Sequence, residues 1–325
     1  MKFKKTLLIT IVLMTILSLG VVSAQDNVTD DATSASQDDA IELESNDDSK
    51  LSDDASTAYN KTVYVETAEG SDDGAGSEAS PYKTISKAIS DVDTSDKAVI
   101  YLGSGNYSDV NNTNLQINLD HKNNNGSLTF IGDSNGGTII DGNNTSPIFK
   151  SICSNSIVTF INITFTHGMS SSGSAINSNG KLTIDNCVFE ENNADDRAAV
   201  YSRYGNLTVQ NSKFYKNTAY GDADLYFSDG SATLINNIFE SSTVTSSYAD
   251  VSYSNVGKIT IVGESYGNVI IDAEHAKSDG GVWAPGTNIF TFGENLEIKL
   301  VNLTLINCEG SPVEAYGLTM KDNIV

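Results

Sequence analysis

Asn186-Cys187-Val188-Phe189 is one of four stretches that place a Phe three residues after an Asn and that recur every 24 to 25 residues. The other three are Asn162-Ile163-Thr164-Phe165, Asn211-Ser212-Lys213-Phe214 and Asn236-Asn237-Ile238-Phe239. A short segment of alternating apolar and Thr residues precedes each Asn, as in Leu182-Thr183-Ile184. This fixed period, filled with short β-patterned segments, predicts a solenoid. Each coil must stack on the next because one coil alone cannot bury its apolar face.

Aligning the repeats predicts which side chains face the interior. Because side chains alternate along a strand, the residues on either side of each Thr share the inner face. The predicted inward columns are Val158, Leu182, Leu207 and Ala232; Phe160, Ile184, Val209 and Leu234; Phe165, Phe189, Phe214 and Phe239; Ala194, Ala219 and Val244; and Ile176, Val200, Leu225 and Val251. Three strands per coil with a shared inner face predict an all-β parallel β-helix. The Asn column is expected at a corner, either as a hydrogen-bonded ladder along the stack or as turn formers.

A larger repeat overlies the short one. Leu128-Thr129-Phe130-Ile131-Gly132 recurs as Ile259-Thr260-Ile261-Val262-Gly263, so a block of several coils is duplicated. We expect one β-helix over 59–325, with a first block over about 59–257 and a second block that begins at 258 and is truncated. Solenoids need polar capping coils. The expectation is therefore a fragment of a longer surface protein, whose C-terminal end is prone to self-association.

The first 58 residues are predicted to lie outside the β-helix. Residues 1–24 combine lysines, an apolar run and a Val-Ser-Ala ending, which indicates a secretory signal peptide, with an uncleaved anchor as the alternative. Residues 25–58 hold eleven acids, one base and no aromatic residue, which predicts a disordered acidic linker. No later stretch is apolar enough to span a membrane. The net charge of −23 disfavours nucleic acid and anionic lipid as partners.

One short helix is expected ahead of the coils. Ser80-Pro81 fits an N-cap followed by proline at the first helical position. Ile85, Ala88, Ile89 and Val92 then fall on one helical face. Such a helix would cover the open hydrophobic end of the first coil.

The opening segment also carries a family resemblance. Gly70-Ser71-Asp72, Ser80-Pro81-Tyr82-Lys83-Thr84-Ile85 and Gly105-Asn106-Tyr107 resemble the opening module of pectin-lyase-like right-handed parallel β-helix proteins. The coils, with Ala198-Ala199-Val200-Tyr201 leading into the next strand, are similar to adhesin-like surface proteins of methanogenic archaea and to polymorphic outer-membrane-protein repeats. The resemblance covers about residues 60–325. It implies a right-handed β-helix in a secreted, cell-surface protein, although the fold hosts both enzymes and adhesins.

Few carboxylates are placed to act on a polysaccharide. The candidate catalytic residues are Asp195, Asp196 and Arg197, with Asp185 one strand earlier. The competing interpretation is a solvated turn, because the positions one period away hold Ser, Tyr and Gly. No outer column is expected to keep titratable groups through consecutive coils, as an acid and a base held near one bond would require. A polysaccharide lyase or hydrolase is therefore the alternative function.

An acidic loop before the helix is the one candidate metal site. Asp72, Asp73 and Glu78 could hold a calcium ion, although the spacing of an EF-hand is absent. No other cofactor is predicted.

Several other polar residues are assigned structural roles. The three cysteines, Cys153, Cys187 and Cys308, fit neither a disulfide framework nor a zinc site and are interpreted as structural thiols. His167 is placed in a surface turn, and Asp224, beside a coil corner, is expected to be solvated.

Tyrosines are prominent among the residues predicted to face outward. Tyr suits carbohydrate or protein contacts because it offers a large contact area at low entropy cost, but its strand propensity is an equal explanation. The tyrosines are Tyr201, Tyr204, Tyr215, Tyr220, Tyr226, Tyr248 and Tyr253. The sequence thus predicts a secreted, adhesin-like protein that binds surface glycans or proteins of a host or neighbouring cell without catalysis.

Overall fold

A computed structural model describes most of the predicted β-helix. The described residues are 59–119, 126–221, 223–240 and 242–244, followed by a series of strands between 251 and 321. Side chains are described only up to residue 242. The predicted signal peptide and acidic linker lie outside the described residues. Among those residues, no helix has the length and apolar character that crossing a membrane requires.

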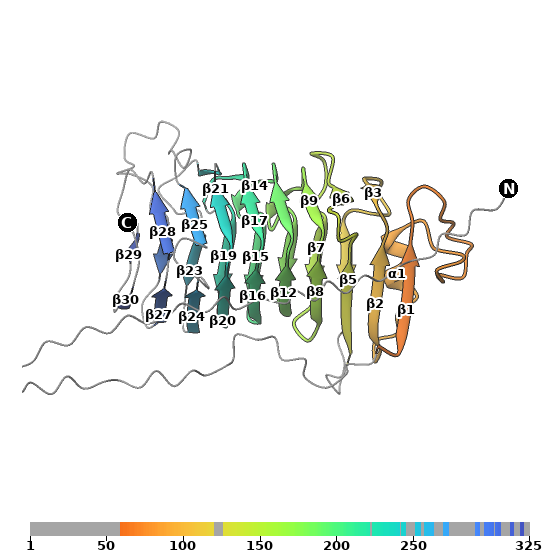
Figure 1. Cartoon of the computed structure of the whole chain (residues 1–325), viewed down its shortest axis with the longest axis horizontal. Coiled ribbons are helices and arrows are strands. Elements are labelled where there is room, and N and C mark those ends of the chain that lie inside the picture. The colour runs from red at the N-terminus through yellow and green to blue at the C-terminus, as the bar shows by residue number, and fades with distance from the viewer. Residues whose placement is uncertain are drawn as a thin grey trace, which may run out of the picture. The chain divides into compact units, whose positions relative to one another are not determined.

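The described strands form four parallel sheets (Figure 1). Sheet 1 contains β1 (Lys61–Val65), β2 (Lys97–Leu102), β5 (Ser127–Ile131), β8 (Ile157–Ile161), β12 (Lys181–Asp185), β16 (Asn206–Gln210), β20 (Ser231–Ile235), β24 (Gly257–Val262), β27 (Leu296–Val301) and β30 (Thr319–Lys321). Sheet 2 contains β3 (Gly105–Tyr107), β6 (Thr138–Asp141), β9 (Thr164–Thr166), β13 (Val188–Glu190), β17 (Lys213–Tyr215), β21 (Ile238–Glu240), β25 (Val269–Asp272) and β28 (Leu303–Ile306). Sheet 3 contains β4 (Leu115–Ile117), β7 (Phe149–Ile152), β11 (Ile176–Ser178), β15 (Val200–Arg203), β19 (Leu225–Ser228), β23 (Val251–Ser254), β26 (Phe290–Phe292) and β29 (Val313–Glu314). Sheet 4 contains β10 (Met169–Ser172), β14 (Asn193–Arg197), β18 (Thr218–Ala219) and β22 (Thr243–Val244).

Each coil visits the sheets in a fixed order. The coil that begins with β8 turns at Asn162 into β9, turns again at His167 into β10, and continues through β11 to Gly180 and the next strand of sheet 1. Consecutive coils pair in parallel throughout sheets 1 to 3, with register shifts in sheet 3 where β7 pairs with β4 and with β11. The predicted parallel β-helix is therefore confirmed. Its right-handed sense is the one that parallel crossovers nearly always take.

The middle coils contain a fourth strand that the sequence did not predict. Sheet 4 lies between sheets 2 and 3 in chain order and includes the small-residue column of Ala194 and Ala219. In the coil before it, the chain instead runs through a turn from β6 to β7. The fourth strand arises because four successive coils have enough residues at this corner to extend and pair.

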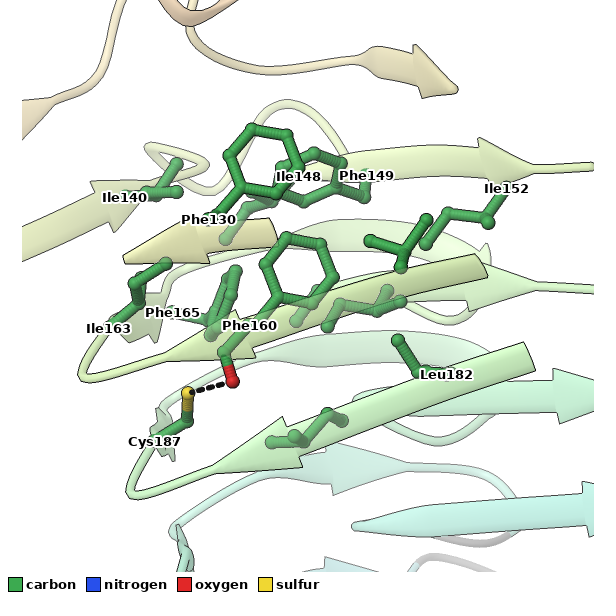
Figure 2. Packing of buried hydrophobic residues seen from close by; sticks show 14 of the residues in the cluster. Phe130, Ile140, Ile148, Phe149, Ile152, Phe160, Ile163, Phe165, Leu182 and Cys187 are labelled. Carbon is green, nitrogen blue, oxygen red and sulfur yellow. Dashed lines mark hydrogen bonds between the residues drawn. The ribbon is translucent and has the colours of Figure 1, made fainter. Parts of the chain in front are cut away.

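The predicted inward columns form the core. Every member whose side chain is described is at most 2 % exposed. Phe165, Phe189, Phe214 and Phe239 stack with ring centroids 4.7 to 4.9 Å apart and interplanar angles of 8 to 14°. This spacing equals the distance between neighbouring strands, about 4.8 Å, so the strand register itself stacks the rings. Ahead of this column, Phe130, Phe149 and Phe160 pack against one another (Figure 2).

A column of buried polar side chains also runs through the interior, which the sequence did not predict. Asn192 Oδ1 accepts the backbone N–H of Gly168 at 2.9 Å, and Asn217 Oδ1 accepts the N–H of Asn192 at 3.1 Å. Ser242 Oγ continues the series by accepting from Asn217 N–H at 3.1 Å. Each of these residues follows a corner at which the backbone N–H is turned inward. A buried N–H needs an acceptor, so a short polar side chain from the next coil fills this place.

A parallel series explains Cys187. Its backbone N–H donates to Ser212 Oγ at 3.1 Å, and Ser212 N–H donates to Asn237 Oδ1 at 2.9 Å. The Cys187 thiol contacts the carbonyl oxygen of Phe160 at 3.6 Å (Figure 2). Burial raises the pKa of this thiol to about 12. Cys187 and Cys153 are both free thiols, while Cys308 lies outside the described residues.

The Asn corners combine both predicted roles. Asn162, Asn186, Asn211 and Asn236 all adopt left-handed backbone angles, with φ between 50° and 59°, which Asn tolerates better than most residues. Asn186 Nδ2 donates to Asn162 Oδ1 at 2.8 Å, but the next amide, that of Asn211, turns to Asp185. The column is therefore a set of turn formers in which the bond between Asn186 and Asn162 is a ladder bond.

The helix α1 (Ile85–Ser90) begins later than predicted. Its N-cap is Thr84, whose side chain accepts a backbone N–H from the first turn at 3.2 Å. The proposed N-cap at Ser80-Pro81 is wrong, because Tyr82 pairs with β1 and keeps this stretch extended. The role of the helix is as predicted: it packs on the first coil (Figure 1), and its buried residues join the main core.

The expectation that Asp224 is solvated is wrong. The residue is fully buried, because the register of β19 with β15 places it beside Ala199, which is also buried. Its Oδ1 accepts from Asn217 Nδ2 at 2.8 Å and from Ser242 Oγ at 2.7 Å, while Oδ2 has no hydrogen-bond partner among the described residues. Burial raises the pKa of Asp224 to about 7, although these two hydrogen bonds oppose the rise.

We predict that Phe214→Ala lowers the free energy of unfolding by about 3–5 kcal/mol, as truncations of buried aromatic residues do. Phe214 is fully buried and has a stacked Phe on both sides. Chemical denaturation measures the change. Tyr220→Ala, at a side chain that is 57 % exposed, is the control and should change stability little. A loss below about 1 kcal/mol for Phe214→Ala would contradict the packing described here.

We also predict that Asp224 makes the protein less stable as the pH rises from about 4 to about 7. In this window the folded state keeps a proton that the unfolded chain has released, because burial raises the pKa of Asp224 from 3.8 to about 7. The free energy of unfolding therefore falls with pH, by on the order of 1 kcal/mol per pH unit. Asp224→Asn keeps the acceptor oxygen and cannot ionise, so it should remove this slope. Identical slopes in denaturation curves of the two proteins would contradict the assignment.

Candidate functional site

The three proposed calcium residues have different surroundings. Asp72 Oδ1 accepts the backbone N–H groups of Lys83 and Thr84 at 3.0 and 2.9 Å, and its Oδ2 accepts from the Thr84 hydroxyl at 2.8 Å. Asp72 therefore holds the start of α1. Asp73 and Glu78 are exposed. Among the described residues, no group of three or more His, Cys, Asp or Glu side chains is arranged to hold a metal ion.

The proposed catalytic residues Asp195, Asp196 and Arg197 lie at a bulge of β14. Here β14 has one residue more than β10 opposite it, and a bulge re-aims the side chains it contains. Asp195 and Asp196 are exposed, and Arg197 Nε lies 3.8 Å from Asp196 Oδ2. The Arg197 guanidinium lies over the ring of Tyr226, 4.5 Å from its centroid. Asp185 is not part of this group, because it lies in sheet 1 and bonds an Asn at the corner.

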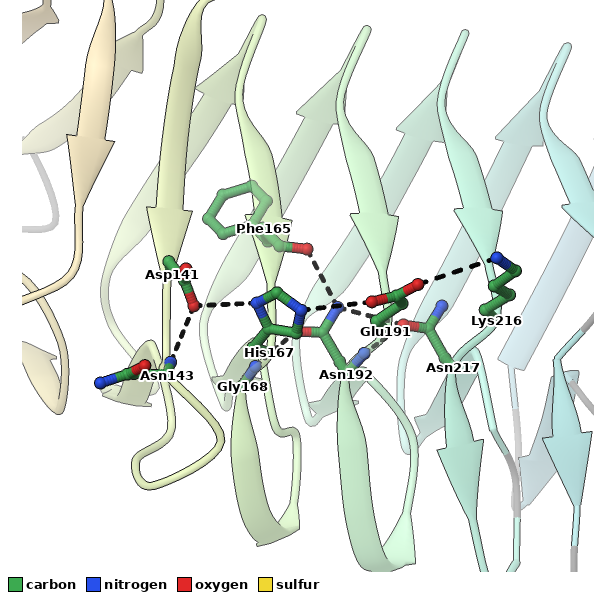
Figure 3. Close-up of polar contacts among 9 residues, drawn as sticks. All are labelled: Asp141, Asn143, Phe165, His167, Gly168, Glu191, Asn192, Lys216 and Asn217. Carbon is green, nitrogen blue, oxygen red and sulfur yellow. Dashed lines mark hydrogen bonds and ion pairs between the residues drawn. The ribbon is translucent and has the colours of Figure 1, made fainter.

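A column of titratable side chains on the outer surface was missed. Asp141 Oδ1 lies 3.1 Å from His167 Nδ1, His167 Nε2 lies 3.2 Å from Glu191 Oε2, and Glu191 Oε1 lies 3.8 Å from Lys216 Nζ (Figure 3). We call these four residues the charged column. They come from four consecutive coils, so the expectation that no outer column keeps titratable groups through consecutive coils is wrong.

The charged column is set by the backbone at one corner. His167, Glu191 and Lys216 have φ values of 50°, 55° and 53°, and each follows the ladder Phe of its coil by two residues. This fixed offset is the signal that would have found them. It was obscured because the residue types differ from coil to coil, whereas a repeat is recognised by residues that stay the same.

The column has the parts of a proton-transfer site. An imidazole with a carboxylate at each nitrogen can pass a proton between them, and the His167 side chain is 34 % exposed. Directly inside, the amides of Asn192 and Asn217 hold the corner backbone in place (Figure 3). The arrangement is therefore rigid, open to solvent and able to act as an acid or a base.

A second group of functional side chains extends along sheet 3, from the end of β14 in sheet 4 to the turn between β15 and β16. Tyr201 and Tyr226 stack with centroids 4.9 Å apart and an interplanar angle of 10°, and Arg197 covers Tyr226. Arg203 lies 4.7 Å from the centroid of the Tyr204 ring, and its Nη2 donates to the Tyr204 hydroxyl at 2.7 Å. We call these five residues the arginine–tyrosine face. Arg197 and Arg203 are the only arginines in the sequence.

Both arginines influence Tyr201. Burial raises the pKa of Tyr201, while the positive charges of Arg203 and Arg197 oppose the rise. Both guanidinium groups therefore lie near one aromatic stack, Arg197 over Tyr226 and Arg203 close to Tyr201. Each also has a carboxylate nearby, since Arg197 lies 3.8 Å from Asp196 and Arg203 lies 3.9 Å from Asp229 Oδ2.

The predicted outward tyrosines are partly confirmed. Tyr204 and Tyr220 are 59 and 57 % exposed, whereas Tyr226 is only 7 % exposed. Tyr226 points outward but is covered by its neighbours, Tyr201 and Arg197. The remaining members behave differently: Tyr201 and Tyr215 are half-buried, and the side chains of Tyr248 and Tyr253 lie outside the described residues.

Comparison with known proteins gives a similarity in structure and none in sequence. No protein-family model matches the chain, and no curated protein matches it in sequence. Among solved structures, the chain is similar to a pectin methylesterase from Aspergillus niger in deglycosylated form, with 16 % sequence identity and a TM-score of 0.30. The similarity covers 81 % of this chain and 85 % of that one.

Proposed function

We propose that this protein is a secreted, adhesin-like surface protein that binds carboxylate-bearing glycans at the arginine–tyrosine face and does not cleave them. The observation that carries the proposal is the placement of both arginines of the chain beside one stacked tyrosine pair.

Charge supports an acidic ligand. An arginine guanidinium matches a carboxylate with two parallel N–H donors, and such charge-assisted bonds are stronger than neutral ones. The chain is strongly acidic, so an anionic glycan would bind best where its guanidinium groups are gathered. Arg197 and Arg203 supply these groups, and a carboxylate of the ligand would compete for them with Asp196 and Asp229.

The fixed positions of the tyrosine side chains support a role in binding. Tyr201 and Tyr226 are fixed by stacking and by the register of β15 with β19. Little side-chain entropy remains to be lost when a ligand binds. Tyr204, whose hydroxyl is held by Arg203, extends the same surface with an exposed ring.

A second candidate function is polysaccharide hydrolysis at the charged column. The observation that favours it is the contact of His167 with Asp141 and Glu191 at hydrogen-bond distance. Hydrolysis of a glycoside needs an acid and a base on either side of one bond. The first proposal is preferred because both His167 nitrogens are already engaged by carboxylates.

We predict that the purified chain binds hexagalacturonate and that Arg197→Gln weakens this binding about tenfold or more, because hydrogen bonds to charged groups contribute about 1.5–3 kcal/mol. Tyr201→Ala should weaken it similarly. Isothermal titration calorimetry measures the dissociation constants, and added salt should weaken binding. Lys150→Gln removes one exposed positive charge from β7 in the same sheet and should leave binding unchanged. Equal losses of affinity for Lys150→Gln and Arg197→Gln would show that net charge alone accounts for binding, which would contradict the proposal.

We further predict that incubation with polygalacturonate, with or without calcium, releases neither reducing nor unsaturated ends. The assay includes Glu191→Gln and His167→Asn, which disrupt the charged column, and Asp196→Ala at the bulge of β14. Release of ends that one of these variants abolishes would establish the enzyme and overturn the non-catalytic proposal.

A further inference from the structure

A hollow of about 410 Å³ lies on sheet 1 at the N-terminal end of the β-helix. Its lining includes Tyr64, Tyr101, Glu66, Ser104 and Asp133, from β1, β2 and the segments that follow β2 and β5. Its volume falls within the roughly 300–1,000 Å³ of small-molecule sites. It lies on a different sheet from the arginine–tyrosine face, and none of its lining residues belongs to the charged column, whose Asp141 is in sheet 2.

The sequence of the first coils creates this hollow. The register of β1, β2 and β5 puts Tyr64, Tyr101 and Ile131 in one column. The two tyrosines stack at 5.2 Å with an interplanar angle of 21°, and Tyr101 is 37 % exposed. At Ile131 the column changes from an aromatic ring to a smaller side chain, so space opens beside Tyr101.

Glycine allows close packing at the wall of the hollow. A Cβ added at Gly103 would lie 2.1 Å from Glu66 Oε1, and one at Gly132 would lie 2.2 Å from a backbone oxygen. Because Gly103 has no side chain, the Glu66 carboxyl can lie directly against it. The hollow is thus bounded by an aromatic ring, an aliphatic side chain and bare backbone, with carboxylates at its rim.

The two carboxylates differ in how they are held. Asp133 accepts hydrogen bonds from the Ser104 hydroxyl and the backbone N–H of Asn135, which lower its pKa. Burial raises the pKa of Glu66, and the charges of Glu69 and Asp133 raise it further. No Lys, Arg or His lines the hollow, so it presents acceptors without a balancing positive charge.

We propose that this hollow binds one neutral pyranose residue of a glycan, with Tyr101 packed against the C–H face of the sugar and with Glu66 and Asp133 accepting hydrogen bonds from its hydroxyl groups. An aromatic side chain offers apolar contact area at low entropy cost, and paired carboxylate oxygens match neighbouring hydroxyl donors. Acidic sugars are excluded by repulsion from the two carboxylates. The preference is thus opposite to that of the arginine–tyrosine face.

The test uses the full chain and three neutral probes, cellohexaose, mannohexaose and hexa-N-acetylchitohexaose, with hexagalacturonate as the acidic comparison. We expect saturable binding of at least one neutral probe in titration calorimetry. Tyr101→Ala should weaken that binding at least tenfold, whereas Tyr101→Phe, which keeps the ring, should not. Asp133→Asn, a surface change, should weaken it several-fold. Tyr220→Ala, at an exposed tyrosine outside the hollow, should have no effect, and thermal melts confirm that each variant is folded.

The two glycan proposals fail separately. If the binding of hexagalacturonate depends on Arg197 but not on Tyr101, the proposal for the arginine–tyrosine face is supported. The proposal for the hollow is decided by the neutral probes. The hollow proposal is overturned if no neutral probe binds, if Tyr101→Ala leaves neutral binding unchanged, or if the Tyr101-dependent ligand proves to be tetramethylammonium, which would make the site a receptor for cations.

Discussion

Parallel pairing in register is the constraint on which the rest of this structure depends. Every position in one coil lies one strand spacing from its equivalent in the next, so each residue must be compatible with a close copy of itself. Apolar positions satisfy this by stacking, as the rings of Phe165, Phe189 and Phe214 do at 4.7 to 4.9 Å. Buried polar positions satisfy it by offering an acceptor to the coil before, as Asn192 and Asn217 do.

The same constraint shapes the outer surface in a different way. Outward positions also form columns. Because water solvates exposed side chains, equivalent residues in neighbouring coils need not be of the same type. Along one corner, His167 separates the carboxylates of Asp141 and Glu191, and Lys216 follows Glu191. Repulsion between identical charges at this spacing would be unfavourable, and no two carboxylates of this column are neighbours. The column is therefore stable as a structure whatever chemistry it performs.

Sequence periodicity predicted the interior well and the exterior poorly. The inward columns were assigned correctly because burial selects similar apolar residues at equal spacing, as at Leu182 and Leu207. The charged column was missed because His167, Glu191 and Lys216 share a position and not a residue type, and because Asp141 lies opposite Thr166, outside that position. The N-cap of α1 was misplaced because the local signal of Ser80-Pro81 is outweighed by the pairing of Tyr82 with β1. Asp224 was taken as solvated because only the register reveals that it lies beside Ala199.

The corners also determine where the chain can change its length. From one coil to the next, Ser178 pairs with Ser202, a separation of 24 residues, while Leu182 pairs with Leu207, a separation of 25. The added residue enters between sheet 3 and sheet 1, at the turn that carries Arg203 and Tyr204. The Asn corner between sheets 1 and 2 admits no such addition here, since the pairings on both sides of it keep one separation. Between β5 and β8, however, the corner between sheets 1 and 2 does change its length, since Leu128 pairs with Val158 at a separation of 30 and Ile139 pairs with Thr164 at 25. Insertions, and with them new surface chemistry, can therefore enter at either corner while the strands keep their pairing.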